Sequence, residues 1–197
     1  MAMNAKAWWN TAYVSIQGLL GTEYQLRTKT TSLNITGGNP DIEGLDTFGG
    51  KITRLTTKED IEISFDGIPT SHADFDWIMA GQTASTTFSA TGATITTSVS
   101  TKYRVTLLWT DQTCTSAAIQ AITASNEAYR KSYADCYWNG LETSMDAGDI
   151  LKATLTFKTT DQDADGKNNW YVAAKDTTTG TLAAMTAYTS STTKWNT

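Results

Sequence analysis

Residues 129–158 read YRKSYADCYWNGLETSMDAGDILKATLTFK, and this stretch decides the fold class. Its second half alternates strictly between apolar and polar residues, a period of two that is typical of a strand with one buried face. The apolar set is Leu151, Ala153, Leu155 and Phe157. Residues 146–149 (DAGD) are turn-forming types, so the sequence predicts two long strands joined as a hairpin.

The register of this hairpin follows from matching its faces. A three-residue loop over 146–148 places Gly148 at the left-handed position that such loops require. It sets Tyr137 opposite Phe157, Leu141 opposite Ala153, and Glu142 opposite Lys152. A slip by one residue would turn a whole strand over. We therefore predict that one polar set faces water, namely Glu142, Ser144, Lys152, Thr154 and Thr156.

Upstream, residues 51–57 and 60–66 are predicted to form another hairpin. Its second arm alternates cleanly, with Ile61, Ile63 and Phe65 on one face. The opposite polar face, expected beside the first polar set, consists of Glu62, Ser64 and Asp66. A short helix is predicted over 72–80, because Ser71 can cap it and its apolar residues fall three and four positions apart.

The remaining segments are less regular. Residues 12–27 predict strand broken at Gly18 and Gly21, residues 83–110 end in a strand, and residues 116–128 fit helix or strand. Residues 34–50 contain five glycines and one of the two prolines, so they predict a long loop that a partner orders. The segment 160–197 is polar, and its role is open.

Composition supports a β-rich protein of one domain over residues 1–197. Threonine, a β-branched residue, occurs 38 times. The formal net charge of −5 argues against a nucleic-acid-binding surface. No apolar run approaches the ~20 residues of a membrane span, and the N-terminus lacks a secretory pattern, so we expect folding in the cytoplasm. Cys114 and Cys136 are expected to be free and buried.

Residues that carry chemistry are sparse. The only histidine, His72, has no nucleophile elbow nearby, and no phosphate-binding glycine motif occurs, so no enzyme is predicted. Asp161, Asp163 and Asp165 precede Gly166 in the pattern D-x-D-x-D-G, the first half of a calcium loop. The second half fails, because Val172 stands where the bidentate glutamate belongs. An acidic turn is the alternative interpretation, and no other cofactor is expected.

The hairpin at 129–158 resembles the C-terminal hairpin of the major tail tube proteins of tailed viruses, of the long non-contractile type. The shared pattern is Ala134-Asp135-Cys136-Tyr137, then Leu141-Glu142-Thr143-Ser144, a small glycine turn, and a Thr-rich strand ending at Phe157. The upstream order agrees, because a predicted hairpin at 51–66 is followed by a short helix at 72–80, and the Gly-rich segment 34–50 matches the long inter-strand loop of that family. The likeness covers residues 51–159 by pattern. The segment 160–197 has no counterpart.

The resemblance implies a mostly β fold, a tail-tube-type barrel or sandwich with one short flanking helix. Long hairpins of six subunits would join into one ring barrel, and rings would stack into a tube with other tail proteins at its ends. Genome DNA would pass without specific binding, since a ring of six carries six times −5, or −30. The subunit would be made in the host cytoplasm and reside in the virion tail.

The resemblance assigns places to two sets of residues. The two polar faces would line the bore of the tube. The loop 34–50 would contact a neighbouring subunit through a mixed polar and apolar set, namely Asn39, Asp41, Glu43, Asp46 and Phe48. Two alternatives stay open at this point: another self-assembling β-rich tube, sheath or surface-layer subunit, and a calcium-dependent binding module.

Overall fold

The computed structural model describes residues 12–21, 23–26, 33–38, 41–45, 51–56, 60–68, 102–144 and 152–195. Within these ranges the chain is built from antiparallel strands, and they contain no helix, so none that could cross a membrane. The mostly β prediction is confirmed. The predicted helix at 72–80 and His72 lie outside the described residues. The strands are β1 (Tyr13–Gly18), β2 (Glu23–Gln25), β3 (Leu33–Gly38), β4 (Asp41–Leu45), β5 (Lys51–Thr56), β6 (Asp60–Gly67), β7 (Tyr103–Thr110), β8 (Ala128–Ser144), β9 (Lys152–Thr160) and β10 (Trp170–Lys175).

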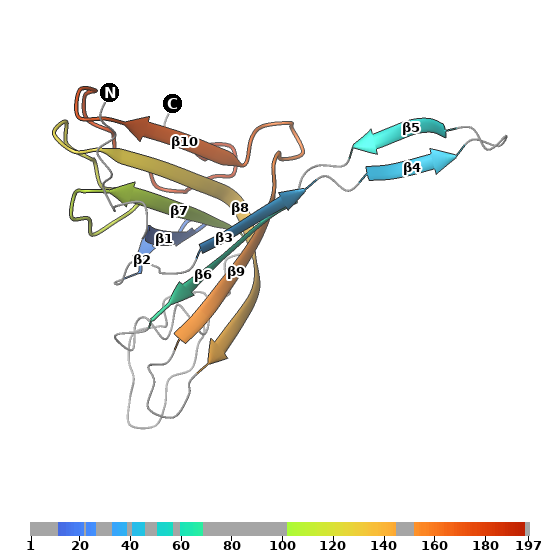
Figure 1. The fold of residues 1–197 in the computed structure, drawn as a ribbon, viewed down its shortest axis with the longest axis horizontal. Coiled ribbons are helices and arrows are strands. Elements are labelled where there is room, and N and C mark those ends of the chain that lie inside the picture. The colour runs from blue at the N-terminus through green and yellow to red at the C-terminus, as the bar shows by residue number, and fades with distance from the viewer. Residues whose placement is uncertain are drawn as a thin grey trace, which may run out of the picture.

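The 17-residue strand β8 organises the fold, because its two halves belong to two different layers (Figure 1). Its first half pairs with β7 and β10, in a layer ordered β2-β1-β7-β8-β10. We call this layer the covered sheet. Its second half pairs with β9, in a layer ordered β8-β9-β6-β3 that we call the open sheet.

Two irregularities let β8 pass from one layer to the other. Between the pairs Tyr103↔Cys136 and Val105↔Tyr133, β8 carries one residue more than β7, and Asp135 adopts a φ of 51°. A second extra residue, Asn139, lies between Trp138 and Gly140 opposite β9. Such bulges bend and twist a strand, so they explain how one strand serves both sheets.

The main core lies between the two sheets. The open sheet contributes Ile61, Ile63, Phe65, Leu155 and Phe157, all buried. Phe157 packs against three aromatic rings, with centroid distances of 6.0 Å to Phe65, 5.6 Å to Tyr103 and 5.3 Å to Trp138. The covered sheet contributes Val14, Ile16, Val105, Leu107 and Tyr133. The apolar faces predicted from alternation are therefore confirmed for β6 and β9.

Several sequence predictions hold in outline. The strand at 12–27 divides into β1 and β2 at the predicted break, and the two long strands of 129–159 are present as β8 and β9. Strand β7 covers the C-terminal end of the segment 83–110, where a strand was predicted. Cys114 and Cys136 are buried and are not joined in a disulfide, as predicted. Residues 116–128, expected as helix or strand, are mostly irregular, with one bridge from Ile122 to Leu182 and only the last residue in β8.

The upstream hairpin was predicted wrongly. Residues 51–56 do not pair with 60–66, because β5 pairs with β4 while β6 lies between β3 and β9. Much of the expected loop at 34–50 is therefore strand. Gly37 and Gly38 suggested a loop, yet both lie in the ladder opposite Ile61 and Asp60. The alternation of β6 indicated its faces correctly, but it contained no information about which strand pairs with it.

The register of the β8–β9 hairpin also differs from the prediction. Leu141 lies opposite Leu155 and Glu142 opposite Thr154, two residues along from the expected partners. An even shift preserves the faces. Nearer the bulges the prediction of faces fails, because Trp138 rather than Tyr137 lies opposite Phe157, and Tyr137 is 55% exposed. The predicted turn at 146–148 lies outside the described residues.

Candidate functional site: the open sheet

The face of the open sheet turned away from the core carries rows of paired polar residues. In one row Glu62 lies between Thr36 and Lys158, and in the next Ser64 lies between Asn34 and Thr156. A third row joins Asp66 to Thr154, which in turn lies opposite Glu142. Strand alternation places all of these on one side, because their sequence neighbours Ile61, Ile63 and Phe65 are buried.

Cross-strand contacts fix this polar face. The Lys158 ammonium lies 3.0 Å from a carboxylate oxygen of Glu62, with both side chains about half exposed. The hydroxyl of Thr154 donates to the Asp66 carboxylate at 2.8 Å. Such pairs contribute modestly to stability, and they tie neighbouring strands together on the polar face.

Most of the residues predicted to face a bore occur together on this face. Glu142 and Lys152 are exposed, whereas Glu62, Ser64, Asp66, Thr154 and Thr156 are partly buried by one another. Ser144 lies opposite Lys152 in the ladder. The members of the face that sequence reasoning missed are Asn34, Thr36 and Tyr137. The first two were assigned to a loop, and the bulges in β8 turn Tyr137 outwards. Whether this face lines a bore stays a prediction.

The open sheet ends in two edges that have no partner strand among the described residues. On one side, β3 pairs only with β6. On the other side, residues 137–144 of β8 pair only with β9, since β7 reaches only to Cys136. An unpaired edge presents backbone donors and acceptors to any strand that approaches. The sheet is therefore open to extension on both sides.

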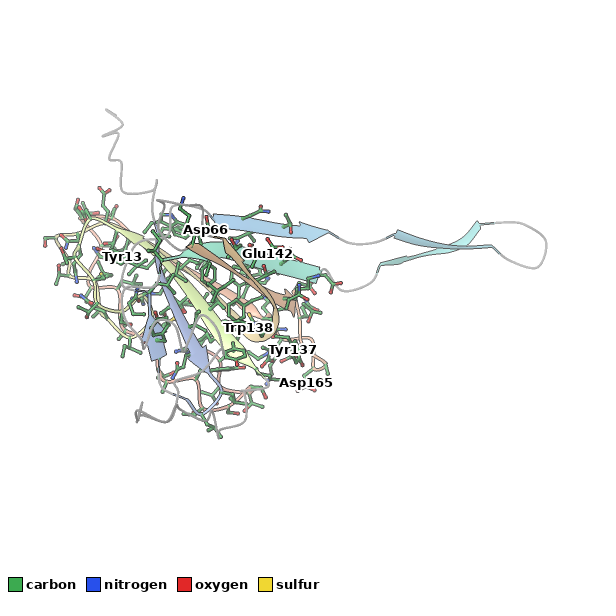
Figure 2. The ribbon with its side chains drawn as sticks, turned by 90° about the horizontal axis from the view of Figure 1, so that it is seen from below. Tyr13, Asp66, Tyr137, Trp138, Glu142 and Asp165 are labelled. Carbon is green, nitrogen blue, oxygen red and sulfur yellow. The ribbon has the colours of Figure 1, made fainter. Side chains whose placement is uncertain are left out.

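Strands β4 and β5 form a two-stranded ribbon that projects from the end of the β3–β6 pair (Figure 2). Two residues predicted to contact a neighbour, Asp41 and Glu43, lie in β4, opposite Thr56 and Arg54. The other three, Asn39, Asp46 and Phe48, lie outside the described residues. Of the predicted contact segment 34–50, the described residues are therefore strand rather than loop.

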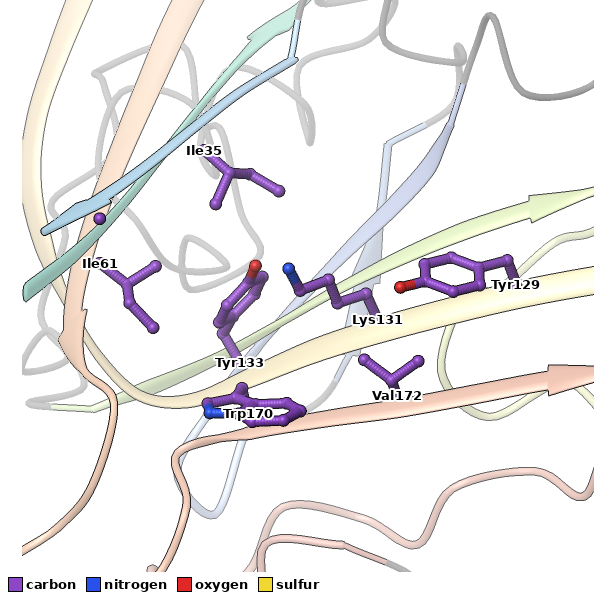
Figure 3. Close-up of a pocket in the computed structure, with 8 residues that line it drawn as sticks. Ile35, Ile61, Tyr129, Lys131, Tyr133, Trp170 and Val172 are labelled. Atoms are coloured by element: carbon purple, nitrogen blue, oxygen red, sulfur yellow. The ribbon is translucent and has the colours of Figure 1, made fainter. Parts of the chain in front are cut away.

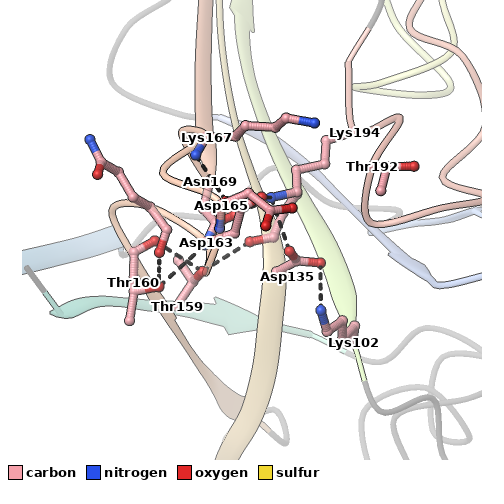
Figure 4. Close-up of polar contacts among 12 residues, drawn as sticks. Lys102, Asp135, Thr159, Thr160, Asp163, Asp165, Lys167, Asn169, Thr192 and Lys194 are labelled. Carbon is pink, nitrogen blue, oxygen red and sulfur yellow. Dashed lines mark hydrogen bonds and ion pairs between the residues drawn. The ribbon is translucent and has the colours of Figure 1, made fainter. Parts of the chain in front are cut away.

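The calcium-loop candidate forms a tight turn between β9 and β10 (Figure 4). The Asp163 carboxylate accepts hydrogen bonds from the backbone N–H groups of Asp165 and Lys167, both at 2.9 Å. Its second oxygen lies 2.6 Å from the ammonium of Lys194. Gly166 completes the turn with a φ of 78°. These contacts hold the pKa of Asp163 at about 2, with the Lys194 hydrogen bond as the largest cause.

Lys194 occupies the place that the sequence analysis gave to a cation. It is 3% exposed, and its ammonium also binds Asp135 at 3.0 Å and the side-chain oxygen of Asn169 at 2.6 Å. Within the described ranges, no group of three carboxylate, cysteine or histidine side chains is arranged to hold a metal ion. The acidic-turn interpretation fits this geometry, and calcium binding by Asp161, Asp163 and Asp165 stays a prediction.

The polar segment that follows β10 is a strap, which we define as residues 176–195, and it crosses the outer face of the covered sheet. Two buried arginines bind its backbone: Arg130 donates to the carbonyl of Ala183 at 2.6 Å, and Arg104 to that of Lys194 at 3.2 Å. The Tyr188 hydroxyl donates to Asp135 at 2.6 Å. Burial lowers the pKa of both arginines and raises that of Tyr188. No role for this segment was predicted from the sequence.

Comparison with known proteins gives structural likeness without sequence relatives. No family model matches the chain, and no curated protein matches it. One similar chain comes from the sheath–tube complex of an extracellular contractile injection system (PVC). It is 15% identical to this chain, the TM-score is 0.42, and the match covers 88% of this chain and 95% of that one. The SPP1 tail tube chain is 10% identical, with a TM-score of 0.42, and the match covers 85% of this chain and 80% of that one. The Hcp1 protein from E. coli EAEC 042 is 10% identical, with a TM-score of 0.38, and the match covers 83% of this chain and 98% of that one.

Proposed function

We propose that this chain is a structural, non-enzymatic subunit that assembles into a hollow tube, the tail tube of a tailed virus of the long non-contractile type. Six subunits form a ring, and rings stack to form the conduit through which the genome leaves the particle. The observation that carries this proposal is the open sheet, which combines one buried face, one polar face and two edges that lack a partner strand in the described part of the chain.

The strand directions of the open sheet suit closure into a ring. Its four strands alternate in direction, so β3 runs opposite to β8. When copies are related by rotation, the β3 edge of one copy meets the β8 edge of the next in antiparallel orientation, and the pattern continues without a break. Head-to-tail contacts of this kind close into rings. Closure also removes the exposed edges that would otherwise promote aggregation.

The polar face would then line the inside of the ring. With four strands from each of six copies, the barrel has about 24 strands, more than the 16–18 that enclose an aqueous channel. The predicted lining combines hydroxyls, carboxylates and lysines, with Glu62 neutralised by Lys158. A surface without a basic stripe gives duplex DNA little to bind, so the genome passes without specific contacts. Other tail proteins would terminate the tube at its two ends.

Assembly can be tested by removing the ribbon while keeping both sheets. Gly38 and Asp60 are direct partners at the end of the β3–β6 ladder. A two-residue Asn-Gly turn in place of residues 39–59 would therefore close that hairpin without disturbing it. We expect hollow tubes from the unaltered chain in negative-stain electron microscopy, and a folded, monomeric variant. An unaltered chain that stays monomeric at high concentration, or that forms solid fibres, would contradict the proposal.

A further inference from the structure

A buried lysine lies directly against a buried asparagine, where the end of the strap meets the start of β10 (Figure 4). Lys194 is 3% exposed and Asn169 is 2% exposed. The Nζ atom of Lys194 lies 2.6 Å from the side-chain oxygen of Asn169. The amide carbon is one C=O bond of about 1.2 Å beyond that oxygen, so Nζ and Cγ are at most about 3.8 Å apart. This approaches the roughly 3–3.5 Å at which well-placed groups react with one another.

Contacts on both sides hold the Asn169 amide in this place. Its backbone N–H donates to the carbonyl of Asp161 at 2.8 Å, and its backbone carbonyl accepts from the N–H of Ala134 at 2.9 Å. Its side-chain nitrogen donates to the Thr160 hydroxyl at 3.3 Å, so the side-chain oxygen is the atom directed at Lys194. The amide carbon is therefore fixed by the fold against the lysine.

A buried carboxylate stands beside the same lysine. The Oδ2 atom of Asp135 lies 3.0 Å from the Lys194 ammonium, whereas Oδ1 accepts from the Tyr188 hydroxyl at 2.6 Å and lies 3.3 Å from Lys102. Asp135 has a φ of 51°, in the left-handed region that is unfavourable for most side chains. Backbone strain of this kind is concentrated at functional sites. Here it places a proton acceptor next to the lysine.

We propose that Lys194 and Asn169 become joined by an isopeptide bond that the folded chain forms by itself, with Asp135 as the catalytic residue. Oδ2 of Asp135 takes a proton from the ammonium, and the neutral amine attacks the amide carbon. The Nζ–Cγ bond forms and the Cγ–Nδ2 bond breaks. Asp135 passes its proton to the departing nitrogen and receives the second proton that Nζ releases. The ammonia carries that proton away as ammonium, which returns Asp135 to a carboxylate and requires no co-reactant.

The lysine in the apolar groove has only half of this chemistry (Figure 3). Lys131 lies beside Tyr133 in a groove of about 420 Å³, and burial lowers the pKa of Lys131, which favours the neutral amine. The described residues that line this groove include neither an amide nor a carboxylate side chain. A nucleophile without an electrophile forms no bond, so the reaction is specific to Lys194.

The bond would tie the strap to the sheet covalently. The closed segment contains β10 and nearly all of the strap, so both stay together when denaturant opens the covered sheet. A cross-link that closes a loop also removes conformations from the unfolded chain. The ion pairs of Lys194 belong to the chain before the bond forms, and afterwards one N–H remains to donate to Asp163. This inference is independent of the proposed tube assembly, because the bond joins two positions of one chain.

Mass spectrometry of the denatured full-length chain tests the bond directly. After incubation of the folded protein, we expect a chain that is lighter than its sequence by one ammonia. Trypsin cuts after lysine and arginine, so peptides 168–175 and 176–197 should run as one joined species that is uncut at Lys194. A full sequence mass after days at neutral pH would overturn the proposal and leave a buried ion pair only. Ammonia loss with the two peptides separate indicates cyclisation of Asn169 alone and would also overturn it.

Matched variants identify the reacting groups. Asn168→Ala and Lys167→Arg alter exposed residues of the same turn, so both should keep the ammonia loss, whereas Asn169→Ala and Lys194→Arg should abolish it. Asp135→Asn should slow the reaction about a hundredfold, since asparagine tolerates the left-handed backbone but does not take the proton. Near-UV circular dichroism identifies the folded variants. A folded Asp135→Asn chain that reacts at the unaltered rate would overturn the role of Asp135, and the mass of the unaltered chain decides the bond whether or not a variant folds.

Discussion

The two sheets share β8 but differ in what their outer faces meet. The covered sheet has the strap and the loop 111–127 on its outer face, and it buries Arg104, Arg130 and Ser132 there. The open sheet leaves its polar face partly exposed and has two edges without partner strands in the described residues. One sheet is therefore covered by its own chain, while the other presents the edges that the proposed assembly would complete with further copies.

The strap is tied to the covered sheet by buried side chains. The guanidinium groups of the covered sheet bind backbone carbonyls that lie far along the chain, so they fix the strap to the sheet. A buried guanidinium is costly unless its donors find acceptors. Both Nη groups of Arg104 and of Arg130 donate hydrogen bonds, while the Nε of each finds no acceptor among the described residues. No comparable layer covers the open sheet within the described ranges, where its polar side chains bind one another.

The largest expected effect comes from the core that the two sheets share. Phe157→Ala removes a fully buried ring that packs against Phe65, Tyr103 and Trp138. It should lower the free energy of unfolding by about 3–5 kcal/mol, measured in urea. Thr156→Ala, one residue earlier on the polar face, is the control and should cost less than about 1 kcal/mol. Equal losses for both variants would refute the assigned faces.

The next effect concerns the end of the strap. Lys194→Met leaves the carboxylates of Asp135 and Asp163 without their shared ammonium. We expect a loss of about 3 kcal/mol, toward the low end for a broken buried ion pair because Lys102 still lies 3.3 Å from Asp135. Lys167→Met, an exposed lysine in the same turn, should change the free energy of unfolding little. If the free energy of unfolding falls by the same amount in both variants, Lys194 does not anchor the strap.

A smaller effect is expected in acid. The folded pKa of Asp163, about 2, lies below its ordinary value of 3.8. A depressed carboxylate pKa stabilises the fold fully above the ordinary value, and that contribution is lost as the pH falls from about 4 towards 2. The free energy of unfolding should fall less between pH 5 and pH 3 for Asp163→Asn than for the unaltered chain. An equal fall in the variant and the unaltered chain would mean that Asp163 does not contribute to the loss of stability in acid.

The smallest effect is expected from metal removal. Because Lys194 neutralises Asp163, the melting temperature should be the same in excess calcium and in EDTA. A rise with calcium that Asp163→Ala abolishes would restore the calcium-loop interpretation of Asp161, Asp163 and Asp165. Any stabilisation by a bound ion must depend on its concentration, so a calcium titration provides the measurement.

Sequence patterns predicted local features better than pairings. Alternation identified the buried and polar faces of β6 and β9, since a strand with one wet face must repeat every two residues. The partner of each strand depends on contacts between distant residues, so β5 was paired with β6 instead of β4. The bulges at Asp135 and Asn139 gave no recognisable signal, and they changed the face of Tyr137. The strap could not be predicted from the sequence, because the residues that anchor it, Arg104 and Arg130, lie in strands whose other residues are typical of core strands.

Access to the polar face in assembled and free protein tests the central claim most directly. Thr154→Cys lies on the polar face of the open sheet, and Ser125→Cys lies in the exposed loop beside the covered sheet. A maleimide too bulky to enter the tube should label both cysteines in dissociated subunits. In tubes it should label position 125 rapidly and position 154 hardly at all. Equal labelling of position 154 in tubes and free subunits would place that face on the outside and contradict the account.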